Sequence, residues 1–95
     1  MSLDGQRLDP GRYLLVPRTL VFGFREGQVL LQRVPPGRGG WAGRWNGIGG
    51  HVEQGESASQ AARREFREET GLDLTELRLA GEVIVDLGSS PGIGF

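Results

Sequence analysis

The chain has 95 residues and no cysteine, so we expect one small domain, and disulfides, thiolate zinc sites and a cysteine nucleophile are excluded. No apolar run approaches the roughly 20 residues that cross a bilayer, and the start lacks the apolar stretch of a secretory signal, so we expect a cytoplasmic protein. The net charge of −1 is unevenly spread: residues 1–50 carry seven arginines and three acidic residues, whereas residues 51–95 carry four arginines and nine acidic residues. This asymmetry suits an anionic ligand held through a bridging cation, and a stripe of surface charge without function would look the same.

The chain reads as a series of short strands around a single helix. The polar residues 1–11 are expected to form a loose leader, and proline and glycine mark residues 35–43 as a loop. Apolar, β-branched runs on either side of turn residues predict strands. The expected strands are residues 13–24, which Pro17 interrupts, residues 28–34 after a hairpin turn at 25–27, short pieces within 45–52, residues 82–86, and the last residues after a turn at Pro91.

One helix is predicted over residues 57–70. Ser57 is a favourable N-cap, and Gly71 is the expected left-handed residue that ends the helix. Apolar residues that recur every four positions define the face that we expect to be buried. These residues are Ala58, Ala62 and Phe66.

The helix carries a cluster of carboxylates. Glu65, Glu68 and Glu69 stand at positions i, i+3 and i+4, and Glu56 lies just before the helix. Like charges at this spacing repel one another, and the helix dipole disfavours anions near the C-terminal end. A hard divalent cation such as Mg²⁺ or Mn²⁺ would remove the conflict. The alternative is a solvated acidic face with Arg64 and Arg67 as ion-pair partners.

The neighbouring residues make the pattern specific. Gly49 and Gly50 precede the acidic helix, and glycine allows the backbone to approach a metal ion or a phosphate closely. From Gly50 to Leu72 the chain matches Gly-x5-Glu-x7-Arg-Glu-U-x-Glu-Glu-x-Gly-U at all nine specified positions, where U is a bulky apolar residue. This segment resembles the box of the Nudix hydrolase family. The resemblance implies an α+β fold, a Nudix-type α/β/α sandwich with a mixed β-sheet, in which 1–95 form a single, incomplete domain without the C-terminal strands and helix.

The resemblance also implies a reaction and a set of site residues. Nudix enzymes hydrolyse nucleoside diphosphates linked to another group, with Mg²⁺ as the expected cofactor here and Mn²⁺ as the alternative. At the matching positions, the metal ligands would be Glu65, Glu68 and Glu69, with the Gly49 carbonyl as a further ligand. Glu56 would bind the metal through water or steady the loop, and Arg64 would orient the glutamates by ion pairing. One of the glutamates could act as the general base, and Glu68 is favoured, although some members of the family place the base outside the box.

The segment before the box is similar to the MutT-like branch, and especially to enzymes that act on oxidised purine nucleoside triphosphates such as 8-oxo-dGTP. Asn46 matches the position that contacts the purine edge, although an asparagine before Gly47 is equally typical of a turn. Trp45 is expected in the core and His51 at the rim of a strand. Arg33, Arg38 and Arg44 are candidate phosphate contacts, and the backbone at Gly50 is a candidate substrate contact.

Two functions of different class remain open from the sequence. The first is a Mg²⁺-dependent nucleoside triphosphate pyrophosphohydrolase, with a nucleotide as partner and neither a nucleic acid polymer nor a membrane. The second is a non-catalytic remnant that binds metal and nucleotide, and a related enzyme acting on another nucleoside diphosphate derivative is a further alternative. An exposed apolar edge at residues 82–86 predicts either a homodimer formed by strand pairing or a chain that is the ordered part of a longer polypeptide.

Overall fold

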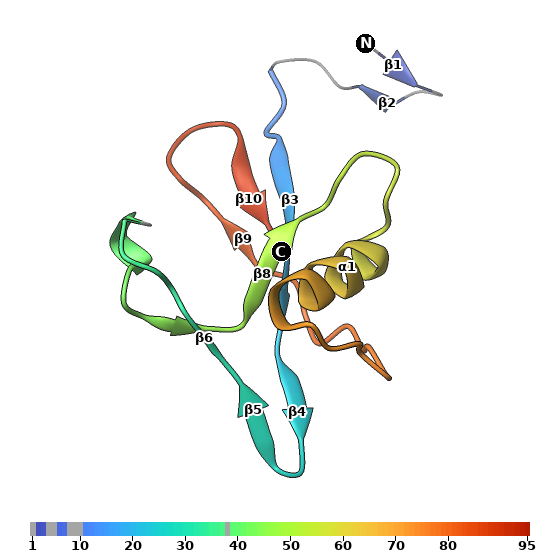
Figure 1. Ribbon diagram of the computed structural model, residues 1–95. Coiled ribbons are helices and arrows are strands. Elements are labelled where there is room, and N and C mark those ends of the chain that lie inside the picture. The colour runs from blue at the N-terminus through green and yellow to red at the C-terminus, as the bar shows by residue number, and fades with distance from the viewer. Residues whose placement is uncertain (1, 4–5, 8–10, 38) are drawn as a thin grey trace. The chain divides into compact units, whose positions relative to one another are not determined.

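The computed structural model describes residues 2–3, 6–7, 11–37 and 39–95, and these residues form two compact units. One unit contains residues 1–17 and 81–95, and the other contains residues 18–80. The elements in chain order are β1 (Ser2–Leu3), β2 (Gln6–Arg7), β3 (Leu15–Val21), β4 (Gly23–Arg25), β5 (Gln28–Leu30), β6 (Gln32–Arg33), the 3₁₀-helix η1 (Gly39–Trp41), β7 (Trp45–Asn46), β8 (Ile48–His51), α1 (Ala58–Thr70), β9 (Ile84–Val85) and β10 (Gly92–Gly94) (Figure 1).

The first unit contains both parallel and antiparallel strand pairs. β10 runs parallel to the start of β3, with Gly92 opposite Leu15, and antiparallel to β9. Val83 and Phe95 extend the second pairing by exchanging two backbone hydrogen bonds. β1 and β2 form a separate antiparallel pair, and the other residues of the expected leader, apart from Gly11, lie outside the described residues. The combination of parallel and antiparallel pairs confirms the predicted mixed sheet. The strand expected over residues 82–86 is shorter than predicted, since β9 covers only Ile84–Val85.

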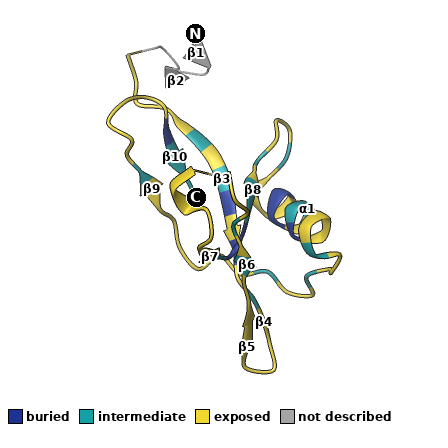
Figure 2. Ribbon diagram, turned by 60° about the vertical axis from the view of Figure 1, so that its left-hand side comes forward, coloured by how far each residue is buried: buried dark blue, intermediate teal, exposed yellow. Residues whose placement is uncertain are grey.

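The second unit places α1 against a two-stranded antiparallel ladder. The later part of β3 pairs with β8, so that Val21 lies opposite Ile48 and Thr19 opposite Gly50. The buried core consists of Val21, Ile48, Ala62 and Phe66, with Leu74 and Leu77 packed against it. Figure 2 shows buried segments, in dark blue, on α1 and on β3. The ladder therefore fixes which face of α1 is buried and which carries charge.

Local signals set the ends of α1 as predicted. Ser57 is in the extended region and its hydroxyl accepts the N–H of Gln60, while the Gln60 side chain accepts the N–H of Ser57. This capping box satisfies two backbone donors that the first turn leaves unpaired. At the other end, Gly71 has φ of 74° and donates its N–H to the Arg67 carbonyl, so the left-handed residue ends the helix.

Two predictions about the core are wrong. Ala58 is exposed, and Ala61 is buried beside Ala62 instead. β8 is only four residues long, and its buried residue Ile48 shares the core cluster with Ala62 and Phe66, which lie beyond the first turn of the helix. Trp45 is 65% exposed, because β7 pairs only with the short strand β6 among the described strands and has no layer packed on it.

The expected strand over residues 13–24 is divided in two. β3 ends at Val21 and β4 begins at Gly23, where a Cβ would lie within 3.2 Å of two Phe66 ring atoms. The predicted turn joins β4 to β5 through Glu26 and Gly27, whose φ angles are 51° and 75°. Two consecutive positive φ angles are typical of the tight turns that match the twist of a hairpin. None of the helices among the described residues is long and apolar enough to cross a membrane.

Candidate functional site

Arg64 links three carboxylates of the box. Its Nε and Nη2 donate to the two oxygens of Glu56 at 2.7 and 2.9 Å, and its Nη1 donates to Glu65 at 2.8 Å and to Glu68 at 3.3 Å. Nη2 also donates to the His51 carbonyl at 3.0 Å, which attaches the cluster to the end of β8. One guanidinium therefore holds side chains from the loop before the helix and from two turns of α1 around a single centre. Arg64 and Glu68 are four positions apart on α1, so the helix places this pair on one side. The neighbouring Glu65 reaches the same Nη1 through its own side-chain conformation.

Glu56 is the best-held carboxylate of this group. Its side chain is only 16% exposed, and it accepts the Glu53 N–H at 2.9 Å besides its two bonds from Arg64. The hydrogen bonds from Arg64 and then from Glu53 favour the charged form and lower the pKa of Glu56 from its ordinary value of 4.5 to about 2. The same contacts with Glu56 and Glu65 raise the pKa of Arg64 further above its usual range. Both partners are therefore charged at every physiological pH.

Gly50 makes room for Glu65. A Cβ built on Gly50 would overlap the Glu65 side chain, and it would lie 2.7 Å from Oε2. The Glu65 side chain is 18% exposed and rests on the strand backbone at this glycine. A glycine is therefore required at this position of the box because the Glu65 carboxylate approaches the backbone closely. The backbone conformation is not the reason, since the φ angle of Gly50 is not in the positive range that favours glycine.

The four box glutamates do not all meet at one point in this structure. Glu68 is 59% exposed and is attached to Arg64 by its longest bond, whereas Glu69 lies on the side of α1 that faces Gln32. Over the described residues, no three His, Asp or Glu side chains are arranged to hold a metal ion. The donor chemistry nevertheless fits a hard divalent cation, since it consists of carboxylate oxygens beside a glycine-bounded strand backbone. Arg64 provides the positive charge that these carboxylates need in this conformation.

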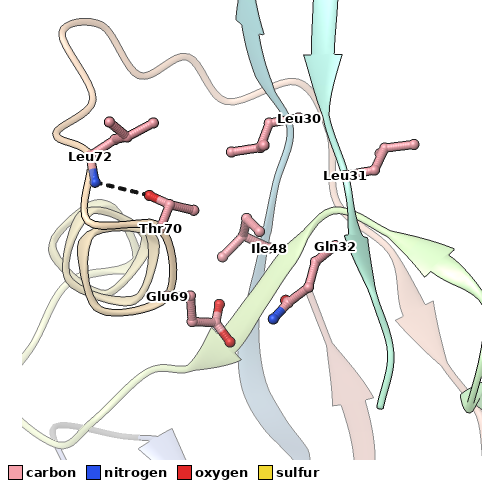
Figure 3. Close-up of a pocket in the computed structure, with 7 residues that line it drawn as sticks. All are labelled: Leu30, Leu31, Gln32, Ile48, Glu69, Thr70 and Leu72. Carbon is pink, nitrogen blue, oxygen red and sulfur yellow. Dashed lines mark hydrogen bonds between the residues drawn. The ribbon is translucent and has the colours of Figure 1, made fainter.

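An open pocket adjoins Glu69 (Figure 3). Its volume is about 260 Å³, and Leu30, Leu31, Ile48 and Leu72 form its apolar wall. The polar side consists of Gln32, Glu69 and Thr70, and the Thr70 hydroxyl donates to the Phe66 carbonyl and accepts the Leu72 N–H. Sequence reasoning missed Gln32 and Thr70. Gln32 follows the apolar run 29–31 directly and precedes Arg33, so the sequence pattern gave no signal that its side chain would line this space.

The candidate substrate residues before the box lie on β6, β7 and the loop between them. Arg33 is opposite Trp45, and Gln32 is opposite Asn46. The Asn46 side-chain oxygen accepts the Gly47 N–H at 2.8 Å, which is the local turn interaction that was the alternative to a purine contact. The Arg44 guanidinium lies over the Trp41 ring, and Arg38 lies outside the described residues. No described hydrogen bond or ion pair connects Arg33, Asn46 or Arg44 to the Arg64 cluster.

Comparison with known proteins identifies the class to which this fold and cluster belong. The NUDIX domain family matches residues 14–92, and the chain therefore belongs to the Nudix family, in its MutT-like branch. It is similar to the oxidized purine nucleoside triphosphate hydrolases of Danio rerio and Mus musculus. The identity to the Danio rerio protein is 48% over 65 residues, which cover 68% of this chain and 40% of that protein. The identity to the Mus musculus protein is 41% over 73 residues, which cover 77% of this chain and 46% of that protein. It is also 46% identical over 54 residues to the nucleoside triphosphatase NudI of Escherichia coli, covering 55% of this chain and 38% of that protein. The chain spans less than half the length of each of these relatives.

Proposed function

We propose that this chain carries the catalytic box of a nucleoside triphosphate pyrophosphohydrolase that depends on Mg²⁺, with Mn²⁺ as a substitute. The observation that carries the proposal is the Arg64 cluster, in which one cation holds Glu56, Glu65 and Glu68 as a charged set beside Gly50. Three carboxylates this close together need positive charge nearby. An enzyme that cleaves phosphoric anhydrides needs a divalent cation beside such carboxylates to neutralise the charge of the phosphates.

The proposal gives each residue of the box a role. Glu65, Glu68 and Glu69 with the Gly49 carbonyl would hold the metal ion, and Glu56 would act through water. When bound, a divalent ion neutralises charge on the diphosphate and lowers the pKa of an attacking water. Arg64 keeps Glu56 and Glu65 ionised and oriented, and Glu68 is the proposed general base because it is the most exposed member of the cluster and the most loosely bound to Arg64. To hold the ion together with Glu65, the side chains of Glu68 and Glu69 would have to turn toward it, which their rotatable bonds permit.

The proposed substrate is an oxidised purine nucleoside triphosphate. Two relatives with this activity in their names are 41–48% identical to the chain over the region that includes the box. Asn46 would read the purine edge through its amide group, whose oxygen also accepts the Gly47 N–H. Arg33, Arg44 and the backbone at Gly50 are the proposed phosphate contacts. Hydrolysis by attack of water on the phosphate chain would yield a nucleoside monophosphate and pyrophosphate.

The decisive experiment is measurement of pyrophosphate release by the purified protein with Mg²⁺ and a set of nucleotides that includes 8-oxo-dGTP, dGTP and ATP. We expect release that stops when EDTA is added and that is fastest with the oxidised purine. Release from a different nucleoside diphosphate derivative would keep the enzyme class and replace the substrate. Metal and nucleotide binding without any release would favour the non-catalytic alternative.

A further inference from the structure

Thr19 is a polar residue in an otherwise apolar layer. It lies in β3, only 8% of its surface is exposed, and no other polar or charged residue of the described chain is buried. Its hydroxyl has no hydrogen-bond partner among the described residues. Burying a hydroxyl without a partner destabilises a fold, and a valine would fill nearly the same space without this penalty. Packing by itself therefore does not explain the hydroxyl.

The strand register shows which way the Thr19 side chain points. Thr19 is directly opposite Gly50, just as Val21 is directly opposite Ile48. Directly opposite residues lie on one face of a ladder, and alternate residues of a strand share a face. Val21 and Ile48 belong to the core that Phe66 of α1 completes, so Thr19 and the side-chain position of Gly50 also face the helix.

Glu65 fills the space in front of Gly50. Its Cγ and Cδ atoms overlap the position that a Cβ of Gly50 would take, and its Oε2 is 2.7 Å from that position. The Cβ positions of directly opposite residues are about 5 Å apart, so the Thr19 side chain and the Glu65 carboxylate are neighbours between β3 and α1. Arg64 donates to Oε1 of the same carboxylate. A buried donor without a partner thus lies on the side of Glu65 away from the oxygen that Arg64 holds.

We propose that Thr19 is a positioning residue for Glu65. Its hydroxyl is the donor that fixes the Glu65 carboxylate in the orientation needed to bind a divalent cation, while Arg64 holds the other oxygen. Thr19 is branched at Cβ and stiff, whereas Glu65 has several rotatable bonds, so a turn of the carboxylate completes the hydrogen bond. This inference rests on the proposed function, because it assigns Thr19 to the metal site of the box. The box pattern begins at Gly50 and does not include this strand residue.

Two substitutions separate positioning from packing. Thr19→Val keeps the shape and removes the hydroxyl, whereas Thr19→Ser keeps the hydroxyl and removes a methyl group. In EDTA, the urea midpoint of Thr19→Val should equal or exceed that of the wild-type protein, because a buried hydroxyl without a partner is lost. The midpoint of Thr19→Ser should be lower, because the missing methyl group leaves a small void.

The affinity for metal should follow the opposite order. Mn²⁺ is titrated without nucleotide, and binding is followed by the loss of the electron paramagnetic resonance signal of the free ion. Thr19→Val should weaken Mn²⁺ binding about tenfold, the loss typical when a group that orients a metal ligand is removed. Thr19→Ser should bind Mn²⁺ as the wild-type protein does. The exposed Thr75→Val is the matched control and should change neither the midpoint nor the affinity.

The outcomes distinguish this inference from the proposed function. Equal Mn²⁺ affinity of Thr19→Val and the wild-type protein would overturn the positioning role and leave the proposed hydrolysis standing. Equal weakening in Thr19→Val and Thr19→Ser would mean that packing alone matters, and absence of Mn²⁺ binding by the wild-type protein would also overturn the inference. Weaker binding by Thr19→Val with rescue in Thr19→Ser would support it even without pyrophosphate release, since the titration contains no nucleotide.

Discussion

Arg64 donates two hydrogen bonds to the Glu56 carboxylate, from Nε to Oε2 at 2.7 Å and from Nη2 to Oε1 at 2.9 Å. The two residues are eight positions apart, and only the loop that leads into α1 allows them to meet. A bidentate arginine–carboxylate pair is among the stronger and more directional polar contacts in proteins. It anchors the start of the helix to the cluster that the proposed reaction uses, so stability and activity are coupled at this pair.

The pKa of Glu56 predicts a stability change at low pH. The folded pKa is about 2 and the ordinary value is 4.5, so the contribution of Glu56 is complete above pH 4.5 and is lost as the pH falls toward 2. We expect the urea midpoint of the wild-type protein to decrease over this range. Glu56→Gln should lower the midpoint at neutral pH and flatten its decrease in acid. Glu76→Gln, at an exposed position, is the control, and an equal flattening by that variant would contradict the assignment.

Gly50 should not tolerate a side chain. In Gly50→Ala the new methyl group would collide with the Glu65 carboxylate, which must then move away from β8. We expect a loss of about 1–3 kcal/mol in the free energy of unfolding, as for other overpacked sites. Gly40→Ala is the matched control, because a Cβ there meets no atom within 4 Å and its φ is not positive. Chemical denaturation measures both, and equal losses would disprove the steric explanation.

The box carboxylates should differ from carboxylates elsewhere in their effect on hydrolysis. Glu65→Gln, Glu68→Gln and Glu69→Gln keep the shape and remove the charge, and each should slow pyrophosphate release by about a hundredfold or more. Glu76→Gln should leave the rate nearly unchanged. Rates at saturating nucleotide and Mg²⁺ make the comparison. If Glu76→Gln slowed release as much as the box variants did, the assignment of the catalytic residues would be wrong.

Divalent metal ions should stabilise the folded protein. A ligand that binds only the native state stabilises it by about 1.4 kcal/mol at ten times its dissociation constant. We expect Mg²⁺ or Mn²⁺ to raise the thermal midpoint, and EDTA to reverse the rise. In Glu65→Gln the rise should be much smaller, whereas in Trp41→Leu it should be retained. An unchanged midpoint for the wild-type protein, with and without nucleotide, would count against a metal site in the box.

The edge of β9 predicts self-association. Among the described strands β9 pairs with β10 alone, and Ile84 on it is 62% exposed. We propose that this edge pairs with the same edge of a second copy, because an apolar strand with unpaired backbone groups readily adds another strand. Sedimentation should show a dimer whose population falls in Ile84→Lys. A wild-type monomer at all concentrations tested would refute the proposal.

Short-range signals made parts of this protein predictable from its sequence. Ser57 and Gly71 bound the helix because a capping side chain and a left-handed glycine act within one turn of their own positions. The turn at Glu26 and Gly27 was predictable for the same reason. The spacing from Gly50 to Leu72 indicated the Nudix family, which the comparison confirms.

Contacts between distant segments were decided by the tertiary structure. Periodicity alone predicted Ala58 in the core, but the core cluster that forms with Ile48 of β8 contains Ala62 and Phe66, and Ala58 is exposed. Composition favoured Trp45 in the core, but no layer packs on β7 and the ring faces water. Likewise, the helical spacing grouped the glutamates on one side of α1. In the structure Glu65 and Glu68 contact Arg64, whereas Glu69 lies toward Gln32 of β6. Helical geometry determines only the direction in which a side chain leaves the backbone, and the partner that it meets depends on which strands pack against the helix.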